Sequence, residues 1–416
     1  MAPRTRTIDA LAVLRRVTQL AVVAAALVTG YRFAQGLTLT TVEKYCPMGG
    51  LATGPSVAEQ GRFTCAAGEF NLAMLAALLA LTLLARKAFC SWLCPVGTLS
   101  EWIGSAVGRI KGAGRRMQSG SDQGLAGVPI ASDGRLRLLR VAVLAAVMAG
   151  TYVTSELVFR AFCPYYVGFS FHGHDVAWWS YPLMALLLLA VVIVPMAWCR
   201  YLCPLGAAMW PFARVGWLRI RREPAACTAC GACARACPHG LPVHAESDLR
   251  SGECTLCLDC VSACSGASAL SLGCAGRGAA VSAVALPAAV AAAVALGVIG
   301  GSAFSLPSYS KTYEHTPGMS RPATATLVVK GVRCVDTARL ASTVFDRYPG
   351  VARFTAYASR NEVVLDYDAQ ILSPADLVRK LQGAVYIPAA DEYVFRVYKV
   401  LSVDGAPMET AAPGKR

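Results

Sequence analysis

Two consecutive runs of four cysteines with the same spacing constrain this chain more than any other feature. Each run reads C-x2-C-x2-C-x3-C; the runs are Cys227, Cys230, Cys233 and Cys237, then Cys254, Cys257, Cys260 and Cys264. Three thiolates two residues apart can surround one iron-sulfur cubane, whereas the fourth lies too far along the chain and completes the neighbouring cluster. We therefore predict two 4Fe-4S clusters, ligated by Cys227, Cys230, Cys233 and Cys264 and by Cys254, Cys257, Cys260 and Cys237.

A zinc site or a disulfide framework is the alternative for these cysteines. Zinc sites pair C-x2-C couples across longer gaps, and disulfide domains do not repeat this spacing. The two runs resemble those of bacterial two-cluster ferredoxins, in which a proline follows the fourth cysteine. Pro238 follows the first run, but Ser265 follows the second. The resemblance implies low-potential, one-electron transfer.

The composition is that of a membrane protein. Of 416 residues, 55% are hydrophobic and 15% are charged, and the mean hydropathy is +0.48. A net charge of +14 would suggest a nucleic-acid partner in a soluble chain, but here the basic residues stand beside apolar runs, as topology signals do. We predict a multi-pass protein of the bacterial inner membrane that contacts lipid and no nucleic acid.

Five apolar runs are predicted to be membrane helices. They are residues 20–37, 72–84, 135–158, 182–197 and 279–300. A cleaved signal is the alternative for the first run. Basic flanks such as Arg86 and Lys87 place the N-terminus and the ferredoxin segment in the cytoplasm, and an odd number of spans places the C-terminal domain in the periplasm. Pro287 is expected to kink the fifth helix.

The first four apolar runs form an internal repeat. In each half, one helix leads to an outer Cys-Pro, at Cys46 or Cys163, and a second helix ends at an inner C-x3-C-P-x-G. A pseudo-twofold bundle would bring the inner thiols together, because both copies lie at the same membrane face. The inner thiols are Cys90, Cys94, Cys199 and Cys203. As a quartet they would hold a metal such as Cu(I) or a cluster, or act as a redox relay; buried packing at helix ends is the alternative.

Helix pairs ending in C-x3-C-P, a basic stretch containing Arg219 and Arg221, and the twin ferredoxin runs together resemble the membrane polyferredoxins of the NapH, NosR and FixG (CcoG) type. The resemblance spans roughly residues 15–300. It implies electron transfer between cytoplasmic donors or the quinone pool and periplasmic redox partners. In one branch of that group it implies copper reduction during oxidase assembly.

The segment after the fifth run is predicted to be an α+β domain. Strands are expected over 324–330, 351–358 and 362–367, helices over 336–347 and 374–383, and the segment 392–400 is able to supply the last strands. The β-α-β-β-α-β order is the split ferredoxin-like plan. The loop from Gly331 to Thr337 resembles that of a heavy-metal-associated (HMA) domain, which binds Cu(I) with two cysteines. Cys334 is present, but Thr337 replaces the second cysteine, so a docking or structural role is the alternative to metal binding.

The outer loop after Cys163 holds a second candidate group. His172 and His174 would ligate a metal or line a quinol pocket. A place among the interfacial aromatic residues is the alternative, because Trp178 and Trp179 follow them. Cys46 and Cys163 are further metal candidates, since the repeat makes them equivalent; the alternative is a disulfide between one pair of Cys46, Cys65 and Cys163.

The predicted fold class is an α-helical membrane protein with an inserted two-cluster ferredoxin domain and a C-terminal α+β domain. The predicted parts are residues 1–117 and 135–222 for the helix pairs, 118–134 for a cytoplasmic linker, 223–270 for the ferredoxin domain, 278–301 for the fifth helix and 322–405 for the HMA-like domain. We predict electron transfer between a cytoplasmic or quinone-pool partner and a periplasmic partner. The alternative is a copper reductase or maturation factor. A nucleotide-binding loop or hydrolytic triad is not evident.

Overall fold

The chain folds into two compact units. One comprises residues 1–35, 74–149 and 158–298, and the other comprises 36–73, 150–157 and 299–416. The computed structural model describes residues 3–35, 37–38, 42–60, 68–110, 130–154, 157–171, 176–266, 269–275, 281–282, 284–304, 306–314, 319–332, 335–387, 392–395 and 397–407.

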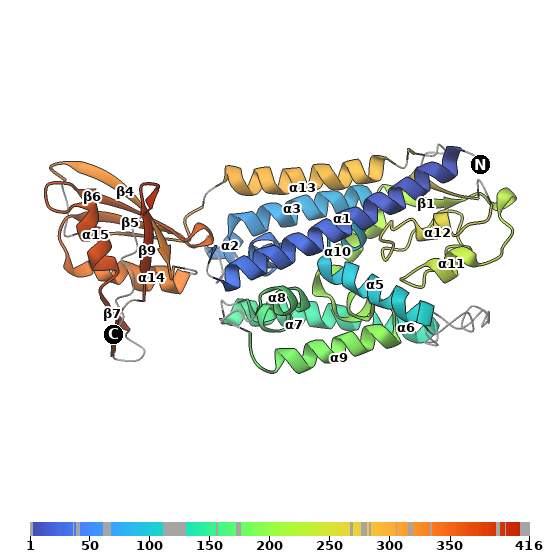
Figure 1. Cartoon of the computed structure of the whole chain (residues 1–416), viewed down its shortest axis with the longest axis horizontal. Helices are drawn as coiled ribbons and strands as arrows, with labels where there is room; N and C mark the ends of the chain where they lie inside the picture. The colour runs from blue at the N-terminus through green and yellow to red at the C-terminus, as the bar shows by residue number, and fades with distance from the viewer. Residues whose placement is uncertain are drawn as a thin grey trace. The chain divides into compact units, whose positions relative to one another are not determined.

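All five predicted apolar runs contain a helix (Figure 1). In the described part of the chain, three spans are long and apolar enough to cross a membrane: Ala10–Ala34, Asp133–Thr154 and Ala285–Ala303. They lie in α1 (Pro3–Ala34), in α6 (Ile130–Leu136) with α7 (Leu139–Thr154), and in α13 (Ala285–Ala303). The apolar helices α3 (Glu69–Ala85) and α9 (Ser180–Ile193) are shorter.

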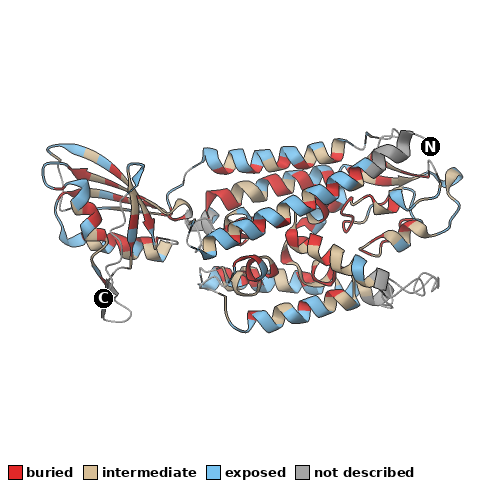
Figure 2. Ribbon diagram, in the orientation of Figure 1, coloured by how far each residue is buried: buried red, intermediate tan, exposed pale blue. Residues whose placement is uncertain are grey.

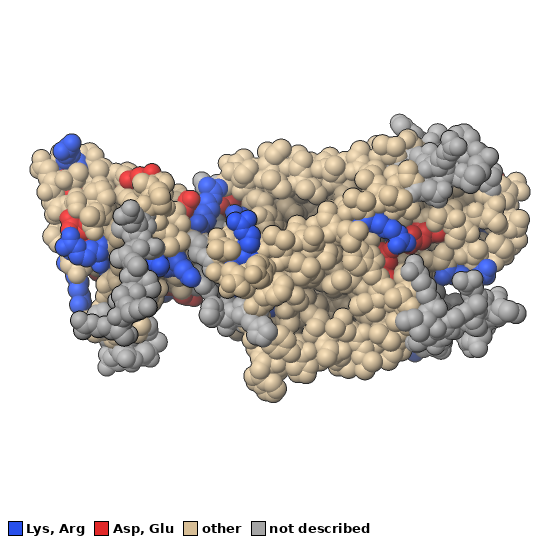
Figure 3. All heavy atoms as spheres, in the orientation of Figure 1, with Lys and Arg blue, Asp and Glu red and all other residues tan. Residues whose placement is uncertain are grey.

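The surface of these helices is apolar. Large hydrophobic side chains are exposed along them, including Leu20, Leu186 and Leu296 at 56%, 61% and 62%, and Figure 2 shows the exposed strips on α1, α9 and α13. Few charged side chains appear on the visible face of these helices in Figure 3. Water would penalise so large an apolar surface, whereas lipid does not.

Two sequence expectations about helix ends were wrong. The linker expected over 118–134 ends by Ile130, where α6 begins; Asp133 lies inside this helix and accepts a 2.8 Å hydrogen bond from Arg137. Residues 111–129 lie outside the described residues. Pro287 is the third residue of α13. The first turn of a helix does not use that backbone N–H, so the proline begins the helix and does not kink it.

The internal repeat is visible in the local structure of both halves. Each of its four Cys-Pro steps ends one helical turn and begins the next helix, because proline suits the first helical position. The outer steps join η1 (Val42–Tyr45) to α2 (Pro47–Gln60) and η4 (Val158–Phe162) to α8 (Pro164–Phe169). The inner steps join α4 (Ala88–Trp92) to α5 (Pro95–Ile110) and the π-helix η5 (Trp198–Leu202) to α10 (Pro204–Val215).

The ferredoxin segment is framed by a strand pair outside its predicted bounds. β1 (Leu218–Arg222) pairs antiparallel with β2 (Leu270–Cys274), Leu218 opposite Cys274. The pair lies at the edges of the predicted bounds 223–270, and Arg219 and Arg221 lie on a strand. Between the strands lie η6 (Pro224–Ala226), α11 (Ala232–Ala236) and α12 (Asp259–Ser262). One buried apolar cluster joins this segment to the helices, with Leu81 and Trp92 beside Ile220 and Leu256.

The C-terminal segment forms a six-stranded sheet in the order β10-β9-β4-β6-β5-β3. Its strands are β3 (Tyr309–Thr312), β4 (Pro322–Lys330), β5 (Val351–Tyr357), β6 (Glu362–Asp368), β9 (Lys399–Val403) and β10 (Ala406–Pro407). The helices are α14 (Val335–Thr343), continued by η7 (Val344–Arg347), and α15 (Pro374–Leu381); η8 (Ala358–Arg360) joins β5 to β6. Leu327, Phe354 and Leu365 are fully buried in its core.

The order β4-α14-β5-β6-α15-β9 follows the predicted sequence of elements, and Ser373 caps α15 in a capping box. The segment 392–400, expected to supply the last strands, contains β8 (Glu392–Phe395) and the start of β9. β9 pairs with β4 in the sheet, whereas β8 pairs with β7 (Ala384–Ile387) in a separate hairpin. Cys334 lies outside the described residues, and the likeness to an HMA domain stays a prediction.

Candidate iron-sulfur and thiol sites

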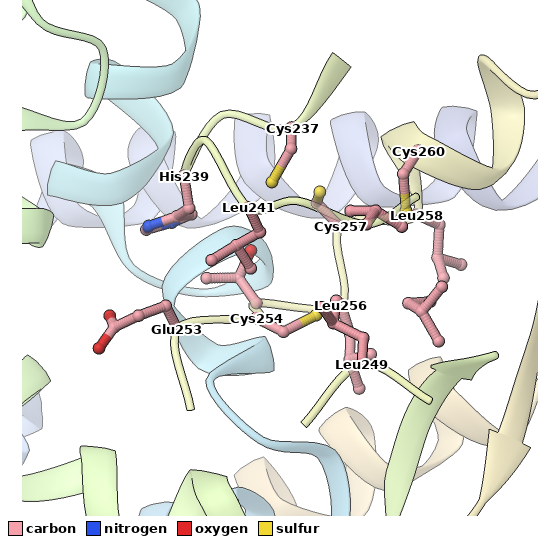
Figure 4. Close-up of a pocket in the computed structure, with 13 residues that line it drawn as sticks. Cys237, His239, Leu241, Leu249, Glu253, Cys254, Leu256, Cys257, Leu258 and Cys260 are labelled. Atoms are coloured by element: carbon pink, nitrogen blue, oxygen red, sulfur yellow. The ribbon is translucent and has the colours of Figure 1, made fainter. Parts of the chain in front are cut away.

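The four cysteines predicted to hold the second cluster line one cavity. Cys237, Cys254, Cys257 and Cys260 share its wall with His239, Glu253 and apolar side chains such as Leu241 and Leu249 (Figure 4). Burial raises the pKa of the Cys260 thiol well above its usual value, and the neighbouring thiols Cys254 and Cys237 raise it further. The cavity therefore combines donors from both runs. Their crossed ligation is a prediction that this arrangement fits.

The other predicted set lies nearer the surface. Cys230 is exposed, Cys227 and Cys264 are intermediate and Cys233 is buried. Burial raises the pKa of Cys233, and the thiols of Cys264 and Cys227 contribute, so the fourth cysteine of the second run is a neighbour of the first run. Backbone N–H groups lower the pKa values of Cys227 and Cys230.

Both runs share an unusual backbone conformation around their second cysteine. Left-handed φ angles occur at Ala229 and Gly231 in the first run, at +53° and +69°, and at Leu256 and Leu258 in the second, at +48° and +65°. A left-handed leucine costs on the order of 1–3 kcal/mol and persists only where its surroundings require it. Such turns direct successive N–H groups towards an anion, which suits a cluster held by thiolates.

In the described part of the chain, groups of three or more Cys, His, Asp or Glu side chains close enough to share one metal ion are absent. A cubane needs no such group, because each thiolate binds a different iron atom. Nothing in the donor set conflicts with 4Fe-4S binding.

The loop of the second run is bound to the end of α3 and to α4. Ser91 donates to the Thr255 carbonyl at 2.7 Å, and the Lys87 backbone N–H donates to the Cys254 carbonyl at 3.4 Å. Arg86 is fully buried and donates to the Ser251 carbonyl at 2.6 Å. Arg86 and Lys87 therefore are not a solvated flank.

A buried carboxylate joins these parts. Glu253 accepts hydrogen bonds from Lys87 Nζ at 2.9 Å and from Arg140 Nη1 at 2.8 Å. Burial opposes ionisation of Glu253, but the hydrogen bonds from Arg140 and Lys87 lower its pKa to about 2. Arg137 lies 3.8 Å from the same carboxylate and donates to the His239 carbonyl at 3.0 Å. Burial lowers the pKa of His239 to about 3, so its imidazole is neutral.

The inner C-x3-C-P motifs have matching local geometry. Cys94 N–H donates to the Phe89 carbonyl and Cys203 N–H to the Trp198 carbonyl, both at 2.9 Å. The two cysteines of each motif do not share one helical turn. Cys90 and Cys199 lie in α4 and η5, whereas Cys94 and Cys203 directly precede α5 and α10, because the proline starts a new helix.

The four inner thiols are nevertheless neighbours. Burial raises the pKa of Cys90 well above its usual value, and Cys94 and Cys203 raise it further. Burial acts likewise on Cys199, with contributions from Cys203, Cys94 and Cys90. The amide N–H of Gly206 lies 3.4 Å from Cys203 Sγ. Thiols of both repeats therefore lie within electrostatic range of each other, next to Lys87.

Not every predicted site residue is described. His172 and His174 lie outside the described residues, as Cys334 does. Cys163 is buried before α8, and Cys46 is half-buried before α2.

Sequence reasoning missed the roles of Lys87, Arg140, His239 and Glu253. Three of them had a weak signal in the sequence, because Lys87, His239 and Glu253 each lie within four residues of a motif cysteine. There was no such signal for Arg140.

These features define a membrane protein with iron-sulfur sites. Residues 68–113 and 176–223 match the family described as 4Fe-4S binding domain, and residues 219–265 match the 4Fe-4S dicluster domain. The first family therefore covers both inner C-x3-C-P motifs, and the second covers both ferredoxin runs.

The chain has named relatives. It is 35% identical over 201 residues to YccM of Escherichia coli (strain K12), which covers 47% of this chain and 54% of YccM. It is 30% identical over 195 residues to the uncharacterized protein MJ0750 of Methanocaldococcus jannaschii, covering 46% of this chain and 75% of that protein. It is 30% identical over 185 residues to the regulatory protein NosR of Pseudomonas aeruginosa, covering 43% of this chain and 24% of NosR.

The chain thus spans about half the length of YccM. No solved structure matches it. Other relatives are protein NirI of Paracoccus denitrificans, 31% identical over 181 residues, and the ferredoxin-type protein NapH of Haemophilus influenzae, 25% identical over 196 residues. This chain belongs to the NapH/NosR-type membrane polyferredoxins.

The two repeat glycines give a matched test of the inner motif. A Cβ on Gly97 would collide with the backbone carbonyl oxygen of Cys90, whereas one on Gly206 would lie 3.5 Å from the equivalent oxygen of Cys199, at ordinary contact. We expect Gly97→Ala to lower the thermal unfolding midpoint and to change the alkylation rates of Cys90 and Cys94. Gly206→Ala should leave both measurements near wild type. Equal effects of the two variants would contradict this asymmetry.

Glu253→Gln tests the buried carboxylate. Removing one partner of a buried ion pair costs about 3–5 kcal/mol, so amide hydrogen exchange should rise in the loop over residues 251–258. Because the pKa of Glu253 is lowered to about 2, its contribution is present above the ordinary Glu pKa of about 4.3 and is lost as the pH falls towards 2. Glu223→Gln, which changes an exposed carboxylate, is the control. Unchanged exchange in Glu253→Gln would mean that this ion pair does not hold the loop.

Proposed function

We propose that the protein carries single electrons from a cytoplasmic or quinone-pool partner through two 4Fe-4S clusters to the thiol quartet at the inner end of the helices. The single observation that carries this proposal is the change in burial along the path. Cys230 of the first predicted set is exposed. The second predicted set lines a cavity, and its loop is bound to the helix that holds Cys90.

Each group has a separate task in this proposal. The clusters, when bound, supply reversible one-electron reduction. Backbone N–H groups at Ala229 and Ala232 stabilise thiolates on the exposed side, where a soluble donor has access. Ile220, Leu249 and Leu256 keep water from the second set, because they line its cavity and are buried. The description of a relative, YccM, as an electron transport protein agrees with this role.

The membrane arrangement is part of the same proposal. The five apolar runs cross the inner membrane, with the ferredoxin domain in the cytoplasm and the C-terminal domain in the periplasm. Electrons then leave through the helices towards a periplasmic redox partner. Exposed apolar side chains along α1, α9 and α13 support membrane insertion. The orientation is supported by the chemistry of the cysteines, because iron-sulfur thiolates need a reducing compartment such as the cytoplasm.

Copper reduction for assembly of a metalloenzyme is the second candidate. The observation that favours it is a group of four neighbouring thiols beside a redox domain, since soft thiolates prefer Cu(I). A quinol dehydrogenase subunit would instead respond to quinol and not to copper. Reduction of the clusters by a quinol analogue, compared with their oxidation by Cu(II), separates the two candidates.

Cys237→Ser tests the crossed ligand sets. We expect it to damage the buried cluster and to leave the exposed one, so one of two reduced-cluster signals should disappear in electron paramagnetic resonance (EPR) spectra. Cys274→Ser is the control, because Cys274 lies on β2 and belongs to neither predicted set. Cys227→Ser should remove the signal of the other cluster. If Cys237→Ser and Cys227→Ser instead removed the same signal, each run would ligate its own cluster.

Reporter fusions test the orientation. An alkaline phosphatase fused after Gly206 should be inactive, since that position precedes the cytoplasmic ferredoxin domain, and one fused after Pro322 should be active in the periplasm. A green fluorescent protein should give the opposite pattern. An inactive phosphatase after Pro322, in a fusion that accumulates normally, would remove α13 as a crossing helix.

A further inference from the structure

Buried positive charge exceeds buried negative charge beside the thiol quartet. The cations are Lys87, Arg137, Arg140 and Arg200, and the carboxylates bonded to them are Glu253 and Asp133. None of the four cationic side chains is more than 13% exposed. Four positive charges and two negative charges leave two positive charges in this network. A buried charge without a counter-charge is costly, so an anionic group should lie close by.

The quartet can supply this charge. Lys87 lies three residues before Cys90 and its carbonyl accepts the Cys90 N–H at 2.9 Å, and Arg200 directly follows Cys199. Four protonated thiols, or two disulfides, are neutral and leave the excess unbalanced. Four thiolates around a core of two positive charges carry two negative charges, which equals the excess.

Several buried polar atoms in the same region have no hydrogen-bond partner in the structure. Both ring nitrogens of His239 lack one, as do Arg200 Nε and Nη1 and Arg140 Nε. His239 is 3% exposed, and its imidazole points away from the sulfur atoms of Cys237 and Cys254 (Figure 4). Buried polar groups normally have a hydrogen-bond partner, so orphaned ones indicate a missing ion or group. Sulfide and thiolate sulfur atoms accept such hydrogen bonds.

We propose that Cys90, Cys94, Cys199 and Cys203 ligate a third 4Fe-4S cluster, whose negative charge is balanced by Lys87, Arg137, Arg140 and Arg200. A single zinc or copper ion fits less well, because groups of three donors close enough for one ion are absent among the described residues. The family described as 4Fe-4S binding domain matches both stretches that supply these thiols. The cluster's role as the next electron carrier rests on the proposed function; its existence does not.

The decisive measurement is the metal content of the anaerobically purified, full-length protein. With three cubanes we expect about twelve iron atoms and about twelve acid-labile sulfides per chain. About eight of each, with no other bound metal, would overturn the third cluster. About eight irons with one zinc or copper ion would also overturn it, in favour of a single-ion site.

A double variant locates the extra iron. Cys90→Ser with Cys199→Ser should lower the iron content by about four atoms while the EPR signals of the two ferredoxin clusters persist. Cys274→Ser should retain the full content. Where the double variant does not accumulate, the wild-type iron count still decides. A wild-type count below about eight would refute the proposed two-cluster function itself, and a count of about eight with electron transfer intact would refute the third cluster alone.

Discussion

A carboxylate withdrawn from water joins the redox domain to the helices. Glu253 belongs to the loop of the second cysteine run. Its hydrogen-bond donors, Lys87 and Arg140, belong to helical segments far away in the sequence. In the same loop, the Ser251 carbonyl accepts a hydrogen bond from Arg86, and the Thr255 carbonyl accepts one from Ser91. The loop that carries the second predicted cluster set is therefore held in place partly by the helical bundle. A separate soluble ferredoxin would lack these donors.

This dependence makes the two cluster sites unequal although their sequences are nearly equivalent. The spacing and the left-handed turns recur in both runs, but it is the loop of the second run that accepts hydrogen bonds from Ser91 and Trp92 of α4. The inner C-x3-C-P motifs are unequal in the same way. Cys90 lies on the helix that contacts the ferredoxin loop, whereas Cys199 lies on a π-helical turn. A duplicated sequence has thus acquired two different environments through contacts made by a third segment.

Local pattern predicted much of this molecule. The cysteine spacing, the Cys-Pro helix starts and the order of strands and helices in the C-terminal domain are encoded within short windows, and the structure contains each of them. Arg86 and Lys87 show where local pattern ends. A basic pair after an apolar run is usually a solvated topology signal. Here the buried partners are the Ser251 carbonyl for Arg86 and Glu253 for Lys87, 165 and 166 positions further along the chain. The β1–β2 pairing was missed for the same reason, since its partners are separated by the whole ferredoxin segment.

The first helix, α1, fixes the distance between two parts of its unit that it contacts near its opposite ends. Near one end, Arg15 contacts Glu101 and Asp259 at 2.8 and 2.9 Å; near the other, Gly30 is packed so closely on the Phe169 carbonyl that a side chain has no room. Fifteen residues of helix separate these contacts by about 22 Å. One inserted residue between them would turn one contact by about 100° relative to the other. The helix thus acts as a ruler that keeps the ferredoxin domain and the short helix α8 at a set separation, whatever the thickness of the surrounding lipid.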